Sequence, residues 1–310
     1  MNREETMVEQ FIQYLRYERN YSSHTVLAYK KDLEQFSLFL SNEYHEQDLS
    51  QADADMIRFW LLSLMESGVS ARSVNRKLSS LKSFWRFLQS KGYVKENPTR
   101  GVLSPKVHKS LPSFLKAEEM DALLEESSAE DDSGSPFVEK RNRLMIEMLL
   151  QTGMRRSELM GLALSDVDMS SCLLRVKGKR DKQRLIPFGP MLQSMIQDYL
   201  QSRNQWQAEC GGLYEFSDCL FVRENGRPLY PQLVYRLVHD TLSKSSTLAK
   251  KSPHVLRHTF ATTLLNNGAE LNAVKELLGH ANLSATEVYT HTTFEELKKV
   301  YKQAHPRADY

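Results

Sequence analysis

The 310-residue sequence has little cysteine and lacks long hydrophobic runs. Its three cysteines, Cys172, Cys210 and Cys219, have no CxxC spacing and no even count. This pattern argues against a disulfide framework and against a zinc cluster. No stretch approaches the roughly 18 apolar residues of a membrane span, and the glutamate-containing N-terminus has no apolar signal-peptide core. We therefore expect a cytoplasmic protein with no membrane anchor.

A large net charge of either sign is also absent. The 41 Lys and Arg residues nearly balance the 39 Asp and Glu residues, which leaves a formal net charge of +2. Any affinity for nucleic acid must therefore come from where the charges lie. No GxxxxGK[ST] phosphate loop occurs, which disfavours an ATP-driven transposase or helicase. No clustered Asp/Glu set suggests a two-metal nuclease, so we expect no metal and no cofactor.

The composition is that of a globular protein, and the length predicts two domains. Apolar residues recur at helical spacing from Val8 to about Tyr93, which predicts an all-helical first domain. A basic stretch between Asn97 and Pro112 contains several prolines and predicts an extended linker. We predict a helical domain at residues 1–105, a linker at 106–112 and a second domain at 113–310.

One helix of the first domain is predicted to have a basic outer face. Its apolar stripe consists of Val74, Leu78, Leu81, Trp85 and Leu88. No acidic residue occurs from 71 to 95, and the basic positions outside the stripe are Arg72, Arg76, Lys77, Lys82 and Arg86. Charge runs usually face water, so this helix alone is compatible with a solvated surface as well as with a DNA contact.

The second domain is predicted to be mostly helical with a small antiparallel sheet. Helices are expected at 114–128, 137–150 and 157–162, with a polar loop at 127–136. Strands are expected at 173–176 and 184–187, joined by a basic hairpin tip that contains Lys179. An extended piece at 220–223 and a turn at 225–226 interrupt the remaining helices, so the fold class is mainly α.

A candidate anion site lies where a helix begins near residue 253. Ser252 is the predicted N-cap and Pro253 the first helical residue, which places His254 and Arg257 in the first turns. A helix N-terminus offers free N–H groups and a positive dipole end to a phosphate oxygen. Each residue by itself is nevertheless more often structural than functional.

A second candidate region follows the helix around Leu271–Leu278, which Gly279 is predicted to end. His280 stands immediately beyond it. Ser284 and Glu287 form a capping-box pattern that would open another helix with Tyr289 in its second turn. A lone tyrosine is usually a half-buried packing residue, so the neighbourhood has to decide its role.

Taken together, these segments closely resemble the catalytic domain of the tyrosine recombinases, the phage integrase family. The resembling segments are Thr152-Gly153-Met154-Arg155, Ser157-Glu158-Leu159, Gly178-Lys179, His254-x-x-Arg257-His258, Leu277-Leu278-Gly279-His280 and Tyr289. The first domain is similar to the SAM-like core-binding domain of that family, and residues 70–76 resemble a phosphate-contacting helix there. Length, domain order and the ending at 305–308 are most similar to the bacterial Xer recombinases.

The resemblance implies a set of catalytic residues: Arg155, Lys179, His254, Arg257, His280 and Tyr289. Two arginines can hydrogen-bond the non-bridging oxygens of a phosphodiester through their forked guanidinium donors. Lys179 can protonate the departing 5′ oxygen. Both histidines can hydrogen-bond the phosphate, and His254 is the favoured acceptor of the tyrosine proton. Tyr289 is then the nucleophile of a 3′-phosphotyrosyl intermediate.

Several assignments near these positions rest on the resemblance alone. Arg156 directly follows Arg155, and alignment with Gly153 favours Arg155. Glu158 is expected to orient an active-site arginine or to cap its helix. Residues expected to contact the DNA backbone are Arg72, Arg76, Lys77 and Lys82 in the first domain and Lys177, Arg180 and Lys182 around the hairpin.

The resemblance also implies a two-domain, C-shaped clamp on duplex DNA, and a homo- or hetero-tetramer on two recombination sites that passes through a Holliday junction. The last helix, around 294–303, is expected to dock in a neighbouring protomer. A second Xer-type recombinase and an activating DNA translocase are candidate partners. Because we see no extra N-terminal arm-binding domain, chromosome dimer resolution is the preferred role. The alternatives are an integrase of a mobile element or integron, a type IB topoisomerase and a catalytically silent DNA-binding protein.

Overall fold

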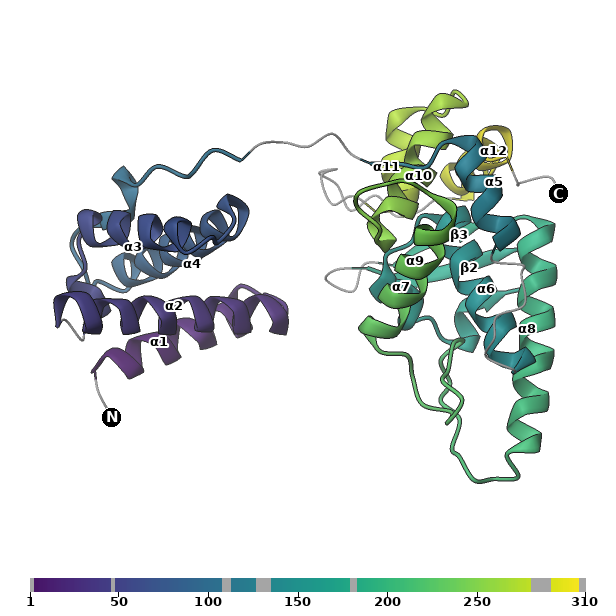
Figure 1. The fold of residues 1–310 in the computed structure, drawn as a ribbon, viewed down its shortest axis with the longest axis horizontal. Helices are drawn as coiled ribbons and strands as arrows, with labels where there is room; N and C mark the ends of the chain where they lie inside the picture. The colour runs from purple at the N-terminus through teal and green to yellow at the C-terminus, as the bar shows by residue number, and fades with distance from the viewer. Residues whose placement is uncertain are drawn as a thin grey trace. The chain divides into compact units, whose positions relative to one another are not determined.

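The chain folds into two compact units, Met1–Ser110 and Leu111–Tyr310 (Figure 1). The structure, a computed structural model, describes residues 3–45, 48–107, 113–126, 135–178, 183–279 and 291–306. The division between the units falls inside the predicted linker at 106–112. Within the described ranges, no helix is both long and apolar enough to cross a membrane.

The N-terminal unit is helical, as its apolar periodicity predicts. Its elements are α1 (Arg3–Gln13), the π-helix η1 (Tyr14–Glu18), α2 (Ser23–Tyr44), η2 (Leu49–Gln51), α3 (Ala54–Glu66), α4 (Ala71–Ser90) and η3 (Pro98–Gly101). Side-chain caps begin several of these helices: Ser22 accepts from the Thr25 N–H, and Ser70 accepts from the Ser73 N–H. The predicted apolar stripe of α4 is confirmed, because all five of its residues are fully buried.

The predicted outer basic face of α4 is wrong at one position, Lys77. Its side chain is buried, and Nζ lies 3.0 Å from Oδ1 of the buried Asp32 and also contacts Gln35. Arg76 binds the same carboxylate through both terminal nitrogens. A buried carboxylate requires a paired cation, and Lys77 flanks the buried stripe next to Leu78, so its stem can lie along the core. Lys77 therefore ties α4 to α2 and is withdrawn as a DNA contact.

The C-terminal unit is mainly α-helical with one small sheet. Its helices are α5 (Ala117–Glu126), α6 (Pro136–Thr152), α7 (Arg156–Met160), η4 (Leu164–Asp166), α8 (Pro190–Glu209), α9 (Pro231–Ser245), α10 (Pro253–Asn266), α11 (Leu271–Leu278) and α12 (His291–Ala304). The strands are β1 (Val167–Asp168), β2 (Leu173–Lys177) and β3 (Gln183–Pro187). They form an antiparallel sheet in the order β1-β2-β3, with Leu174 opposite Ile186. The predicted hairpin strands are confirmed, whereas the two-residue β1 is too short to leave a periodic signal.

Helix α6 is the centre of this unit. It packs against α8 and α10, and its residues from Leu144 to Thr152 are all buried. An all-round buried helix needs neighbours on every side, which α8, α9 and α10 supply. Because the C-terminal end of α6 lies inside the unit, the turn that follows it is held rigidly. That turn carries Arg155.

The last helix, α12, packs on its own unit. Leu297, Tyr301 and Ala304 are buried in a cluster with residues of α10 and α11. The Tyr301 hydroxyl donates to the Gln151 carbonyl at 3.3 Å, and Asn267 Nδ2 donates to the Ala304 carbonyl at 2.8 Å. These contacts lie within one chain, and the expectation that this helix docks in a neighbouring protomer stays a prediction. The apolar surface left by α10 and α11 is covered within the same chain.

Candidate active site

The corner between α6 and α7 fixes the position of Arg155. Gly153 ends α6 in the left-handed conformation, with φ of +59°, and its N–H donates to the Leu149 carbonyl. A Cβ atom at this position would lie 2.4 Å from Cδ1 of Phe260, so a side chain does not fit without a shift. Arg155 follows as the N-cap of α7 in extended conformation. The predicted stop at Gly153 is confirmed.

Glu158 caps α7 and holds the Arg155 side chain at the same time. Oε2 accepts from the Arg155 backbone N–H at 2.7 Å, and Oε1 accepts from Arg155 Nη1 at 2.8 Å. Glu158 thus caps its helix, as expected, and binds the side chain of Arg155. Burial alone would raise the pKa of this carboxyl, but the hydrogen bonds of Arg184 and Arg155 and the charge of Arg184 outweigh burial and lower it. Glu158 is therefore an anion at neutral pH.

Arg184 on β3 also binds Glu158, and sequence reasoning missed it. Its side chain is buried and forms a bidentate ion pair with Glu158, at 2.9 Å for Nη1–Oε1 and 2.8 Å for Nη2–Oε2. A charged residue at an inward position of a strand is the signal that could have revealed it, since buried arginines are rare unless paired. The buried neighbour Ile186 shares this alternation.

Arg257 reaches the same place from α10. Its Nη1 donates to the Gly153 carbonyl at 2.7 Å and its Nη2 donates to the Leu278 carbonyl at 2.6 Å. The predicted helix start is confirmed, with Pro253 as the first residue, although the Ser252 side chain makes no capping bond. Arg257 is buried at 8% exposure, so α10 delivers a guanidinium to the interior edge of the α6–α7 corner.

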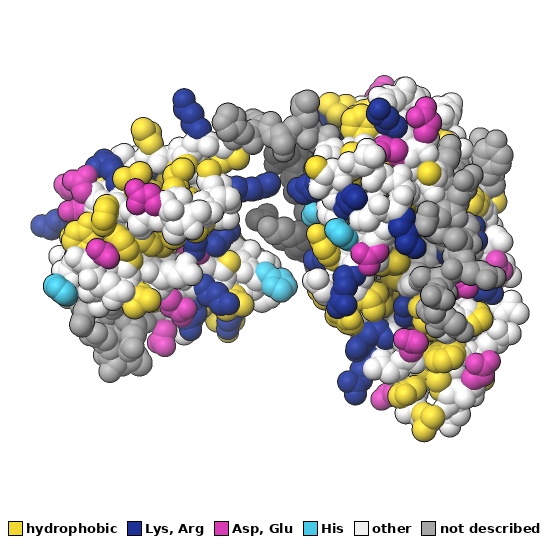
Figure 2. Space-filling model, in the orientation of Figure 1, with side chains coloured by type: hydrophobic (Ala, Val, Ile, Leu, Met, Phe, Trp, Pro, Cys, Tyr) yellow, Lys and Arg dark blue, Asp and Glu magenta, His cyan; other side chains and the backbone are white. Residues whose placement is uncertain are grey.

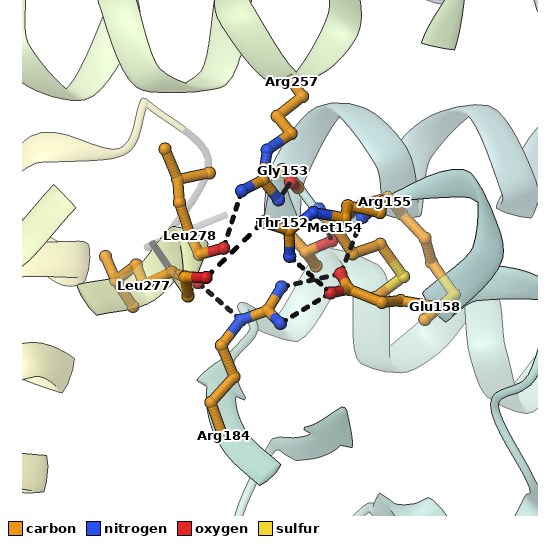
Figure 3. A network of polar contacts seen from close by, with 11 residues as sticks. Thr152, Gly153, Met154, Arg155, Glu158, Arg184, Arg257, Leu277 and Leu278 are labelled. Carbon is orange, nitrogen blue, oxygen red and sulfur yellow. Dashed lines mark hydrogen bonds and ion pairs between the residues drawn. The ribbon is translucent and has the colours of Figure 1, made fainter. Parts of the chain in front are cut away.

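Three successive carbonyls at the end of α11 are each held by one of these arginines (Figure 3). The Leu277 carbonyl accepts from Arg184 Nε at 2.8 Å, the Leu278 carbonyl from Arg257, and the Gly279 carbonyl from Arg155 Nη2 at 3.4 Å. The last carbonyls of a helix have no intrahelical donors and carry partial negative charge. Arginine is well suited to them because its donors are fixed in a fork. The end of α11 therefore gathers arginines from three separate segments.

The arginine cluster has more positive than negative charge. Glu158 is the carboxylate that pairs with its side chains in the described contacts, against the guanidinium groups of Arg155, Arg184 and Arg257. Burial, together with the charges of Arg155 and Arg184, lowers the pKa of Arg257 to about 10 against the opposing effect of Glu158. Crowded like charges are stabilised by a bound anion, and guanidinium groups match the geometry of phosphate oxygens. The cluster is therefore suited to a phosphate.

His254 lies one turn before Arg257 on α10. Its side chain is exposed, and its pKa is lowered by partial burial and then by the charges of Arg257 and other neighbours. Below the usual value of about 6.5, such an imidazole is neutral at pH 7 and can accept a proton. Figure 2 shows histidine side chains among Lys and Arg side chains on the surface of the C-terminal unit. The charges that lower this pKa come from Arg257, His258, Lys250 and Arg156.

The other predicted residues fall into two groups. Lys177 is exposed at the end of β2, and Arg72, Arg76 and Lys82 are exposed or half-buried on α4. Arg156 donates to the Pro231 carbonyl at 3.2 Å instead of joining the cluster, which agrees with the choice of Arg155. The predicted residues that lie outside the described residues are Lys179, Arg180, Lys182, His280 and Tyr289. In the described part of the chain, no group of three His, Cys, Asp or Glu side chains could hold a metal ion.

Comparison with known proteins gives the same assignment for both units. The profile described as the phage integrase family matches residues 113–296, and the profile of the phage integrase N-terminal SAM-like domain matches residues 8–92. The tyrosine recombinase XerC of Chlorobaculum tepidum is 40% identical over 316 aligned residues, which cover 96% of this chain and 94% of the relative. XerC of Listeria welshimeri is also 40% identical, over 99% of this chain and 100% of the relative.

Solved structures share the fold. The site-specific recombinase XerH bound to a palindromic difH substrate, in a post-cleavage complex, matches with a TM-score of 0.71 and 24% identity. That match covers 95% of this chain and 84% of XerH. The Tn1549 transposon integrase in complex with transposon right end DNA matches with a TM-score of 0.70 and 19% identity, over 94% of this chain and 98% of the integrase. With both family profiles matched and full-length relatives at 40% identity, the chain belongs to the phage integrase family and is a tyrosine recombinase, an enzyme that cleaves and rejoins DNA.

Proposed function

We propose that this chain carries out site-specific recombination with the scissile phosphate seated on the arginine cluster. One observation carries the proposal: Arg155 and Arg257 come from distant segments and converge on successive carbonyls at the end of α11, with surplus positive charge. Main-chain contacts hold both guanidinium groups before any ligand arrives. Such preorganisation favours the charge that grows on the phosphate in a pentacoordinate transition state.

The proposed cleavage step is a transesterification. The phenolic oxygen of Tyr289 attacks phosphorus and forms a phosphotyrosyl bond to the 3′ end, while the bond from phosphorus to the 5′ oxygen breaks. The phenolic proton passes to the neutral imidazole of His254, and Lys179 gives a proton to the departing 5′ oxygen. His280 supplies a further hydrogen bond to the phosphate. The energy of the phosphodiester is kept in the new ester, so religation needs no ATP.

Exchange of strands requires a second duplex. A 5′ hydroxyl from the partner site attacks the phosphotyrosyl ester and releases Tyr289, which gives a Holliday junction after the first pair of strands. We propose four protomers on two sites for this sequence of steps, identical or shared with a second recombinase. The side chains proposed to contact backbone phosphates are Arg72, Arg76, Lys82, Lys177, Arg180 and Lys182.

We propose resolution of chromosome dimers as the biological role, with a DNA translocase as a candidate activator. Full-length similarity to several proteins named XerC supports this assignment over a mobile-element integrase. Mapping the recognition site tests it. Cleavage at one chromosomal locus near the replication terminus agrees with the proposal, whereas cleavage at the ends of an integrated element favours the integrase.

The chemistry is tested by trapping the covalent intermediate. Randomised duplexes with a nick near the centre are incubated with wild-type protein, and those that become protein-bound under denaturing conditions are sequenced. The selected duplex then compares wild type with Tyr289→Phe, and with Tyr301→Phe as a matched control whose hydroxyl donates to the Gln151 carbonyl in α6. We expect covalent protein at the 3′ end for wild type and Tyr301→Phe and none for Tyr289→Phe. Covalent protein with Tyr289→Phe contradicts the proposal.

A further inference from the structure

Arg184 is more tightly enclosed than the other arginines of the cluster. Its side chain is 5% exposed, against 35% for Arg155. All three guanidinium nitrogens are engaged, Nε with the Leu277 carbonyl and the two terminal nitrogens with Glu158. A Cβ atom at Gly279 would lie 3.2 Å from its Cδ, so the chain also passes close to its stem. This enclosure favours a role toward other residues and disfavours a direct contact with DNA.

Glu158 is shared between two arginines in a specific way. An ionised carboxylate has about four lone-pair positions, two on each oxygen. Oε1 accepts from Arg155 Nη1 and Arg184 Nη1, while Oε2 accepts from the Arg155 N–H and Arg184 Nη2. The four positions are therefore filled, and Arg184 fills two of them. Without Arg184, each oxygen of this buried carboxylate would lose one of its two donors.

The loss would change the electrostatics of Arg155. With Arg184 present, the negative charge of Glu158 is compensated from the β3 side, and the guanidinium of Arg155 keeps a net attraction for an anion. With Arg184 removed, the same buried carboxylate has Arg155 as its remaining side-chain partner among the contacts described above. A charge buried without its partner is strongly unfavourable, so Glu158 would hold Arg155 more tightly and compete with a phosphate for it.

We propose that Arg184 is a positioning residue of the recombination reaction: it neutralises Glu158 from the side of β3, so that Arg155 remains available to the scissile phosphate. The same side chain ties the start of β3 to the end of α11, through the Leu277 carbonyl. Gln183, which precedes it, pairs with Lys177 in the sheet. The inference rests on the proposed function, because it assigns Arg155 to the phosphate.

The test separates binding of DNA from cleavage. Wild type, Arg184→Met, Arg184→Lys, Glu158→Gln and the double variant Glu158→Gln with Arg184→Met are compared on the nicked duplex selected with wild-type protein. Two quantities are measured for each variant: the dissociation constant for the duplex and the single-turnover rate constant for covalent complex formation. Arg141→Met is the matched control, since Arg141 is also buried and donates to a carbonyl, that of Val222, without contact to Glu158.

We expect loss of Arg184 to slow cleavage, and removal of the competing Glu158 charge to restore part of the cleavage rate. Arg184→Met should slow cleavage by about 100-fold, the effect typical of disturbing one preorganised donor, while the dissociation constant changes by less than about threefold, because the group does not touch DNA. Arg184→Lys should be intermediate. In the double variant the uncompensated carboxylate is gone, and the rate should recover by about tenfold over Arg184→Met. Arg141→Met should lower the melting temperature and leave the cleavage rate of the folded protein near that of wild type.

Two outcomes overturn the inference. If the double variant is no faster than Arg184→Met, neutralisation of Glu158 is not what Arg184 does. If Arg184→Met cleaves at the wild-type rate while folded, Arg184 has no positioning role. Should Arg184→Met fail to fold, Arg184→Lys and the double variant supply the same comparison. Failure of the proposed function is distinguishable, because wild-type protein itself would then form no covalent complex.

Discussion

Each unit of the molecule contains one buried carboxylate shared by two cations, yet the two clusters differ in what surrounds them. In the N-terminal unit Asp32 joins Arg76 and Lys77 and so ties α2 to α4. In the C-terminal unit Glu158 joins Arg155 and Arg184. The C-terminal cluster adds a third arginine, Arg257, whose terminal nitrogens donate to the main-chain carbonyls of Gly153 and Leu278.

The difference indicates how a buried carboxylate paired with two cations can stabilise the fold in one unit and prepare a site for an anion in the other. A carboxylate with two cations is one positive charge in excess, and partial exposure of Arg76 lets water screen it. The added Arg257 is mostly buried, where screening is weaker, and burial together with its cationic neighbours lowers its pKa. Carbonyls orient a guanidinium without cancelling its charge. The C-terminal cluster therefore keeps an attraction for anions in the protein interior.

The largest loss of activity is expected on removal of Arg257. With Arg257→Gln the C-terminal cluster becomes like that around Asp32, one carboxylate with two cations. We expect the single-turnover rate of covalent complex formation to fall by about 10³-fold, as for loss of a charge-stabilising donor at a reacting centre. Arg156→Gln is the matched control, since Arg156 donates to the Pro231 carbonyl outside the cluster. A fall of less than about tenfold for Arg257→Gln would contradict the assignment.

Removal of the carboxylate in the N-terminal unit should cost stability instead of activity. Asp32→Asn leaves Lys77 buried without a counter-ion, which should destabilise α2 and α4 by about 3 kcal/mol. Hydrogen exchange of peptides from these two helices measures the loss locally. Adding Lys77→Met removes the unpaired charge, so the double variant should exchange more slowly than Asp32→Asn alone. Additive destabilisation in the double variant would show that the charge pairing is not the cause.

The sequence predicts the framework of both clusters but not their pairings. Apolar periodicity predicts α4 and its stripe, and the glycine after Thr152 predicts the corner that carries Arg155. These features depend on residues close together in the chain. The partner of Lys77 is Asp32, and no local pattern connects these positions. The error at Lys77 arises because a basic residue beside an apolar stripe can face outward or turn to a buried acid.

Arg184 shows the same limit in the C-terminal unit. The strand around it is predictable from its alternation, yet its partner Glu158 lies on a helix formed by a different segment. The gathering of three arginines at the carbonyls of Leu277, Leu278 and Gly279 follows from packing of α7, α10, α11 and β3. The spacing of residues along the sequence does not indicate that packing. Resemblance to a family supplied Arg155 and Arg257, and geometry supplied Arg184.

A smaller loss of stability is expected at the corner that brings the C-terminal cluster together. Gly153→Ala places a side chain at φ of +59° and against Phe260, which should destabilise the unit by about 2 kcal/mol through backbone strain and overpacking. Because this turn also carries Arg155 and accepts from Arg257, cleavage should slow more than DNA binding weakens. Gly212→Ala, also at positive φ but with open space around it, is the control for strain alone. Equal melting temperatures for these two variants would argue against the contact with Phe260.

The smallest expected effect is a shift in the titration of His254, which reports the excess positive charge of the C-terminal cluster. Burial and the charge of Arg257 both disfavour the protonated form of His254, so its pKa lies below the usual 6.5. In an NMR titration of histidine ring protons, we expect its midpoint below that value. Arg257→Gln removes one of these causes and should move the midpoint upward without restoring it fully, because burial, the largest cause, remains together with the charges of other neighbours. Binding of a DNA phosphate should raise it further, since an anion favours the imidazolium. A midpoint that does not move in Arg257→Gln would mean that the arginine charge is not felt at His254, and its assignment as the neutral proton acceptor beside the cluster would lose its electrostatic basis.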